Sequence, residues 1–278
     1  MMNTTIAQLA ETRKEAYRKR EIAELAESIA IDFINGNILE PEDIAIAEGI
    51  TFSRNHYGNC FDGLLEHQRN RFHIYINEKR VGGKESPRAR HTFAHELGHY
   101  FIDEHRNALK AGKTPSHPSF NGLRAKNMVE READYFASCL LMPSVLFRKC
   151  CGRDPLSAIL IEKLAKTFQT SVSSVIFRYF ELNLFPMLIV LAKDGIIEWK
   201  MVSEDFKYKY LPKKQGELPP TSVAGEYFRL GKKPATQQIV FAYDWCKYHG
   251  VGIKEQLWEK VYYLSDTKVM SVVWRKEK

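Results

Sequence analysis

The spacing of apolar residues along the chain changes its period twice. Residues 5–35 carry apolar side chains at helical spacing up to Gly36, and residues 41–48 predict a short second helix. From residue 50 the period falls to two, which predicts short strands separated by turn residues. These strands are expected at residues 50–53, 60–65 and 72–76. The chain therefore begins with two helices and continues into a small sheet.

Helical spacing returns in the middle of the chain. It is interrupted by one polar segment, residues 105–126, which we expect to be a long loop. Residues 164–179 have the rhythm of a helix-turn-helix, with a turn between two short apolar faces. The expected helical stretches are residues 87–104, 127–141 and 144–184.

Beyond residue 186 the pattern favours strands. Two apolar runs, residues 187–192 and 196–202, flank an Asp194-Gly195 turn and predict a hairpin. Further strands are expected at residues 239–243, 258–264 and 269–274. The whole pattern predicts an α+β fold in three parts: residues 1–150 with helices and a small sheet, residues 151–185 all helical, and residues 186–278 rich in strands.

Composition narrows the choice of function only a little. The apolar fraction of 44% excludes a disordered chain, and 278 residues are enough to bury a core without disulfides. The 41 basic residues exceed the 34 acidic ones, for a net charge of +7, but they are interspersed with acids. This pattern favours a soluble basic surface over a nucleic-acid footprint.

Cysteines and apolar runs indicate the compartment. The five cysteines include no CxxC pair and are an odd number, so a reducing compartment is expected. The N-terminal segment lacks the apolar core of a signal peptide, and no apolar run is long enough to span a membrane. We therefore expect a cytoplasmic protein.

The chemistry of the chain is concentrated in the segment His-Glu-Leu-Gly-His. On a helix, His95 and His99 lie one turn apart and about 40° around the axis, so both imidazoles can reach one ion. Glu96 lies beside that stripe, where it can act as a base without being a ligand. The surrounding residues are mostly apolar, and a buried histidine pair needs a partner. The pattern predicts a zinc site.

Three residues compete to be the third ligand. His105 stands ten residues after His95, but position 102 holds Ile102 instead of the glycine that would turn the chain, so a continuing helix would point His105 away. Glu132 lies about 200° from Glu130 on the predicted helix 127–141, and we expect it to be solvated. Glu130 is therefore the predicted ligand.

Small residues on the same helix support this choice. Ala133 and Ala137 share a stripe with Glu130 and allow two helices to approach closely. Asp134, one turn after Glu130, is placed to accept a hydrogen bond from a ligand histidine. We expect it to orient the site without binding the metal.

Taken together, these residues resemble the ImmA/IrrE family of metallo-endopeptidases. The motif Ala-His-Glu-Leu-Gly-His-Tyr-Phe is followed by Glu-x-x-Ala-Asp-x-Phe-Ala-x-x-Leu-Leu-Met-Pro at residues 130–143. The segments 41–52 and 61–65 and an arginine, Arg90, also agree, so the resemblance covers about residues 20–185. His91 departs from the family, which has an aromatic or aliphatic residue there, and we expect it to pack.

The resemblance implies a function. Residues 1–150 would be a zincin-like metallopeptidase domain, with His95, His99 and Glu130 on Zn²⁺ and Glu96 as general base. The substrate would be a protein, typically a helix-turn-helix transcriptional repressor. Residues 186–278 would have a sensor or regulatory role. Two alternatives stay open: a non-catalytic zincin-fold module that sequesters a repressor or antitoxin, and a DNA-binding regulator with a structural metal.

Further features of the sequence bear on substrate and DNA. The strand at residues 72–76 is a candidate to pair with an extended substrate, and His91, Tyr100 and Tyr135 are candidates to stabilise the oxyanion. The second helix of the segment 164–179 contains one basic residue, so DNA binding is not favoured. Alternating lysines and aromatics at residues 206–210 favour a strand with one packed face.

Overall fold

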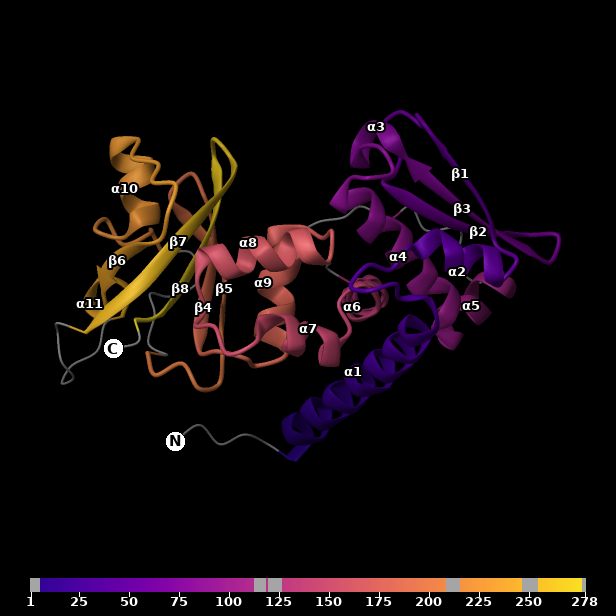
Figure 1. The fold of residues 1–278 in the computed structure, drawn as a ribbon, viewed down its shortest axis with the longest axis horizontal. Helices are drawn as coiled ribbons and strands as arrows, with labels where there is room; N and C mark the ends of the chain where they lie inside the picture. The colour runs from indigo at the N-terminus through magenta and orange to yellow at the C-terminus, as the bar shows by residue number, and fades with distance from the viewer. Residues whose placement is uncertain (1–5, 113–118, 120–126, 209–215, 247–254, 277–278) are drawn as a thin grey trace. The chain divides into compact units, whose positions relative to one another are not determined.

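The structure is a computed structural model that describes residues 6–112, 119, 127–208, 216–246 and 255–276 (Figure 1). The chain forms two compact units, and we describe each by itself. The first comprises residues 1–152 and 163–178, and the second comprises residues 153–162 and 179–278. The three-part functional division at residues 150 and 185 stays a prediction.

The first unit contains a three-stranded sheet with helices packed around it. Its strands are β1 (Thr51–Asn55), β2 (Gly63–Gln68) and β3 (Arg71–Asn77). The order is β1-β3-β2, with β1 parallel and β2 antiparallel to β3. All three strands were expected from the sequence. The proposal that residues 72–76 pair with substrate is wrong, however, because β3 is the central strand and both of its edges are already paired.

The helices of this unit follow the predicted order with two exceptions, one of which is the short helix α3, which was not predicted. The segment 87–104, expected as one helix, is two: α4 ends at Phe101, and α5 begins at Asp103 after the extended residue Ile102 (ψ 111°). Residues 105–110 of the expected loop are therefore helical, and most of the remainder lies outside the described residues. The helices are α1 (Ile6–Phe33), α2 (Pro41–Ala47), α3 (Glu78–Val81), α4 (Pro87–Phe101), α5 (Asp103–Lys110), α6 (Met128–Leu141) and α7 (Ser144–Cys151).

Helix α4 lies at the centre of the unit, and local sequence explains where it starts. Ser86 caps it by accepting a hydrogen bond from Arg88 N, and Pro87 stands at the first helical position. Fully buried side chains, including Phe93, Ala94 and Leu97, pack into the core. Arg90 is 2% exposed and donates to Leu39 O and Glu40 Oε2. The helix is thereby fixed to the segment that follows α1.

Helices α4 and α6 cross at a point where both have small residues. A Cβ added to Gly98 would lie 3.1 Å from the Ala133 Cα and 3.2 Å from the Ala133 O. These distances are shorter than most Cβ contacts in proteins, so a side chain at position 98 would require α6 to shift. The predicted close approach of the two helices is confirmed.

The helix-turn-helix segment forms α8 (Ala158–Thr167) and α9 (Val172–Glu181), and the boundary between the two units passes through both helices. Arg178 is the only basic residue of α9 and is 1% exposed. Its guanidinium donates to Met142 O, Cys139 Sγ and Glu27 Oε1, all within the first unit. It therefore cannot contact a phosphate or a base without unpacking the core.

The second unit is built on an antiparallel sheet of order β5-β4-β8-β7-β6. One face of this sheet packs with α10 (Val223–Leu230) and α11 (Ala242–Trp245) around a core that includes Val190, Trp245 and Val273. The predicted hairpin and three later strands are present, and the α+β fold class is confirmed. The strands are β4 (Met187–Lys193), β5 (Ile196–Val202), β6 (Gln238–Phe241), β7 (Gln256–Ser265) and β8 (Lys268–Arg275).

A buried carboxylate, Glu259 on β7, ties the second unit together. It is 0% exposed and accepts four hydrogen bonds, from Val223 N and Ala224 N at the start of α10, Trp245 Nε1 and Ser271 Oγ. The expected strand at residues 206–210 is not formed at residues 206–208, although Phe206 and Tyr208 are buried. Residues 209 and 210 lie outside the described part of the chain.

Candidate metal centre

Helix α4 carries His95, Glu96 and His99 into the interior of the first unit. Their exposed fractions are 1%, 0% and 4%. The helical repeat places the two histidines one turn apart on the face that meets α6, with ring centroids 4.8 Å apart. Burial of two imidazoles next to each other requires polar partners, and these come from α6.

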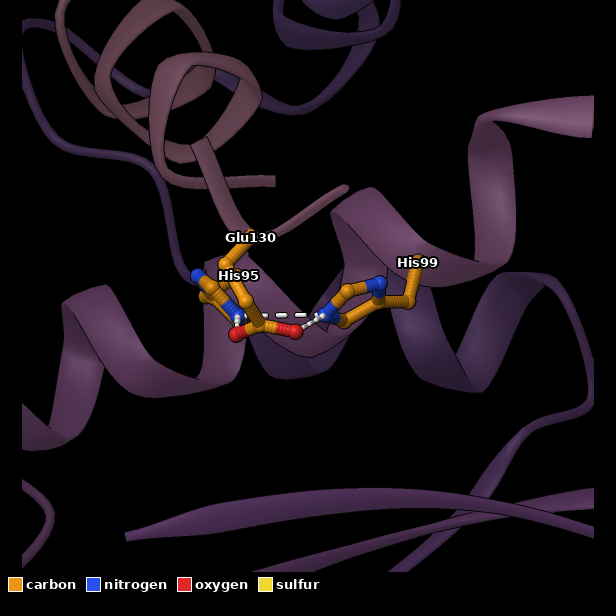
Figure 2. A group of neighbouring side chains, drawn as sticks. All are labelled: His95, His99 and Glu130. Atoms are coloured by element: carbon orange, nitrogen blue, oxygen red, sulfur yellow. Dashed lines mark hydrogen bonds and ion pairs between the residues drawn. The ribbon is translucent and has the colours of Figure 1, made fainter. Parts of the chain in front are cut away.

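The donor atoms of His95, His99 and Glu130 converge on one point (Figure 2). The two Nε2 atoms are 3.1 Å apart. Glu130 Oε2 lies 3.2 Å from the His95 Nε2, and Glu130 Oε1 lies 3.5 Å from the His99 Nε2. One donor atom from each residue lies within 4.8 Å of the others. Two imidazole nitrogens and a carboxylate in this arrangement fit a zinc site with an open position.

Glu130 reaches this point because of how α6 begins. Asn127 caps the helix through a hydrogen bond from Glu130 N to Asn127 Oδ1 (3.1 Å), which places Glu130 in the first turn. The contact between Gly98 and Ala133 then brings α6 close enough for this short side chain to reach both histidines.

Asp134 acts on the far side of His95. Its Oδ1 lies 2.8 Å from the His95 Nδ1, so Nδ1 donates to this carboxylate, and a metal bound at the site would take the lone pair of Nε2. Burial opposes a charge on His95, but Asp134 and Glu130 outweigh it and raise the pKa of His95 well above its ordinary value. A site that attracts a proton this strongly also suits a cation.

Glu96 lies beside the convergence point and is not one of the three residues that converge there. Neither of its carboxylate oxygens has a hydrogen-bond partner of normal geometry among the described residues. Burial raises its pKa to about 7, although the charge of His95 works in the opposite direction. A carboxyl group with this pKa exchanges a proton readily at neutral pH, which is what a general acid-base group requires.

Comparison with known proteins agrees with this geometry. Residues 65–180 match the peptidase M78 family, described as the IrrE N-terminal-like domain. This part of the chain is therefore similar to the ImmA/IrrE family. A solved Mycobacterium tuberculosis transcriptional regulator has a similar fold, with a TM-score of 0.58 and 14% identity, over 91% of this chain and 75% of that one. No curated protein matched the chain.

Two predictions about the surroundings of this IrrE-like site are wrong. His105 was expected to point away, but because α4 ends at Phe101 the chain turns and brings His105 Nδ1 to 3.3 Å from the His99 Nδ1. Glu132 was expected to be solvated, but its side chain is 14% exposed and accepts from His105 Nε2 at 3.0 Å. The acidic pair Asp103-Glu104, typical of a helix start, was the available signal for the break.

The remaining candidates lie around the IrrE-like site with other partners. Tyr100 donates to Glu48 Oε2 at 3.0 Å. The ring of Tyr135 lies 5.8 Å from Lys19 Nζ. His91 is half-buried, and burial lowers its pKa below the ordinary value. The charge of Asp134 opposes this shift, so His91 lies within electrostatic reach of the site. None of these contacts identifies an oxyanion stabiliser.

A small cavity opens beside the catalytic candidates. Its volume is about 140 Å³, and both Glu96 and His99 line it. The rest of the wall is largely apolar and includes Leu65, Leu109 and Val129. The cavity is therefore large enough for one aliphatic side chain next to the site.

Proposed function

We propose that the chain is a zinc-dependent endopeptidase that hydrolyses a peptide bond in a protein substrate. The observation that carries this proposal is the convergence of His95 Nε2, His99 Nε2 and Glu130 beside the buried Glu96. The donor set fits zinc, because both Nδ1 atoms are occupied by hydrogen bonds, which leaves both Nε2 atoms, next to the Glu130 carboxylate, to bind a metal. The match of residues 65–180 to the M78 peptidase family supports the same reaction.

The residues of the site divide the reaction between them. A zinc ion held by the three ligands would polarise the scissile carbonyl and lower the pKa of a water molecule toward about 7. Glu96 takes the proton from the attacking water and passes it to the leaving amine nitrogen. Asp134 keeps His95 in the tautomer that presents Nε2. The buried surroundings of Glu96 exclude bulk water and strengthen these interactions.

We propose a helix-turn-helix transcriptional repressor as the substrate. Family resemblance supports this choice, and the printed name of the Mycobacterium tuberculosis structure, a transcriptional regulator, is consistent with a role in regulation. A cytoplasmic location fits such a substrate. Among the helices described, none is long and apolar enough to cross a membrane.

The alternatives have less support. A module that only sequesters a repressor would not need a carboxylate buried next to the metal ligands, and Glu96 is 0% exposed. A DNA-binding regulator would need basic side chains on the second helix of the helix-turn-helix, whereas Arg178 is buried and hydrogen-bonded.

One experiment separates these functions. The zinc-loaded chain is incubated with the helix-turn-helix protein encoded beside its gene, and the products are analysed by mass spectrometry. We expect cleavage by the wild type and by the exposed-site control Glu85→Gln, and none by Glu96→Gln with zinc still bound. Equal cleavage by Glu96→Gln would refute the mechanism. Binding without cleavage by the wild type would favour the sequestering module.

A further inference from the structure

We propose that His105, Glu132 and Arg18 form a hydrogen-bonded chain that holds His99 in position as a metal ligand. The proposal rests on the proposed metal site and adds positioning residues to it. His99 Nδ1 lies 3.3 Å from the His105 Nδ1, and His105 Nε2 lies 3.0 Å from the Glu132 Oε2. Arg18 then contacts both oxygens of Glu132, with Nε 3.0 Å from Oε1 and Nη2 3.0 Å from Oε2.

Only one arrangement of protons is consistent with metal binding through His99 Nε2. The proton of His99 then lies on Nδ1, which donates to the Nδ1 of His105. His105 must therefore carry its own proton on Nε2, which donates to Glu132. The carboxylate accepts this bond and the two from Arg18. Every hydrogen bond in the chain has one donor and one acceptor, so the chain selects the tautomer that zinc binding requires.

Burial restricts the geometry of this hydrogen-bonded chain of residues. The side chain of His105 is 5% exposed and that of Glu132 is 14% exposed. A buried imidazole without partners would be costly, so the geometry of His105 is determined by the groups on either side. Arg18 also donates to Glu104 Oε2 at 2.8 Å, which fixes the guanidinium at the outer end.

The hydrogen-bonded arrangement also explains why His105 is not itself a metal ligand. It contacts the Nδ1 of His99, whereas the ligand atoms of the site gather at Nε2. The two histidines of the motif are thus supported differently. The Nδ1 of His95 donates directly to a carboxylate, Asp134, whereas the Nδ1 of His99 connects to the carboxylate of Glu132 through the neutral imidazole of His105.

Four helices meet in this chain. Arg18 is on α1, His99 on α4, His105 on α5 and Glu132 on α6. The short helix α5 is required because its start at Asp103 turns His105 back toward α4. The orientation of His99 therefore depends on residues that lie 81 positions before it and 33 positions after it in the sequence.

A matched set of substitutions tests the proposal without a substrate. His105→Leu removes both hydrogen bonds, whereas His105→Gln keeps one acceptor and one donor. Zinc affinity is measured by chelator competition, and the geometry of the site by the visible spectrum of the Co²⁺-loaded protein. We expect His105→Leu to weaken zinc binding about 10- to 100-fold and to alter the Co²⁺ spectrum. The zinc affinity of His105→Gln should lie within a few-fold of the wild-type value. The exposed control His56→Leu should have the same zinc affinity as the wild type.

Further measurements distinguish positioning from a general loss of structure. Circular dichroism of the metal-free variants tests folding, and Glu132→Ala, which leaves His105 in place, should weaken zinc binding in the same direction. Wild-type zinc affinity and an unchanged spectrum in His105→Leu would overturn the proposal while leaving the peptidase proposal intact. A wild type that bound zinc but cut no protein would overturn only the peptidase. A wild type that bound neither metal would overturn both.

Discussion

Gly63 on β2 and Glu96 on α4 are in contact so close that position 63 has no room for a side chain. A Cβ added to Gly63 would lie 2.5 Å from Glu96 Oε1 and 2.5 Å from Thr92 Cγ2. The strand thus forms one wall of the pocket that holds the proposed general base. Real Cβ atoms do not approach other atoms this closely, so any larger residue must displace Glu96 or the strand.

Gly63→Ala is therefore expected to impair catalysis more than metal binding. Displacement of the Glu96 carboxylate should lower kcat by at least about 10-fold, because general acid-base groups contribute about 10²–10⁴-fold and depend on position. Zinc affinity should change little, since the atoms nearest to a Cβ at position 63 belong to Glu96 and Thr92 and to none of the three proposed ligands. Gly83→Ala is the matched control, because a Cβ there meets nothing within 4 Å. Normal kcat in Gly63→Ala would contradict the assigned role of Glu96.

Glu130 and Glu132 should respond differently to the same change. Glu130→Gln removes the charge that faces both Nε2 atoms, and zinc affinity should fall by more than about 100-fold. Glu132→Gln acts only through His105, so the loss should be smaller, within about 10- to 100-fold. Chelator competition gives both values. A larger loss in Glu132→Gln than in Glu130→Gln would move the third ligand.

Asp134 can be tested by separating its charge from its hydrogen bond. Asp134→Asn keeps an acceptor for His95 Nδ1, whereas Asp134→Ala leaves that nitrogen without one. We expect zinc affinity to fall in the order wild type, Asn, Ala, with Ala about 10- to 100-fold weaker than the wild type. Isothermal titration with zinc would show the order. Equal affinity of all three proteins would mean that Asp134 does not orient His95.

Glu259 should control the stability of the second unit. Replacing it with Gln sets an amide N–H₂ against buried donors, which should cost about 2–4 kcal/mol. All four tryptophans lie in this unit, so their fluorescence during urea unfolding reports on it. The exposed control Glu204→Gln should unfold like the wild type. A Glu259→Gln variant as stable as the wild type would show that the four hydrogen bonds contribute nothing net.

The same residue predicts a dependence on pH. Burial raises the pKa of Glu259 above its ordinary value of 4.5, so the folded state binds its proton more tightly than the unfolded state does. Stability of the wild type should therefore fall as pH rises from about 4.5 through the raised pKa. Glu259→Gln lacks this component, so the gap between the two proteins should narrow over that range. If the difference in stability between the two proteins widened with rising pH, the pKa of Glu259 would not be raised in the folded state.

Much of the site was predictable because it depends on local helical geometry. The spacing of His95 and His99, and the alanine stripe that carries Glu130 toward them, are properties of two helices and can be read from periodicity. The position of His105 next to His99 could not be predicted in this way. That position depends on a single residue, Ile102, which leaves the helical conformation. Glu132 was misjudged for a related reason. Its partners, Arg18 and His105, come from other helices, and only their packing reveals that its face is buried.

Strand order was also beyond the reach of the sequence. Periodicity identified three strands but could not show that the last of them, β3, pairs with both others. Such pairing is decided by non-local contacts, in this case a parallel neighbour on one side and a hairpin on the other. The edge strands of this sheet are therefore β1 and β2, and not β3, which the pattern offered as a strand to pair with substrate.

The crossing of α4 and α6 at Gly98 and Ala133 would couple metal binding at the proposed site to folding. Two of the proposed ligands come from one helix and the third from another that begins 29 residues after His99, so the complete site exists only when the helices are docked. An ion that binds the docked state and not the unfolded one stabilises the fold by mass action, by about 2.7 kcal/mol at a hundred times its Kd. Zinc supply would then set the lifetime of this unit in the cell as well as its chemistry.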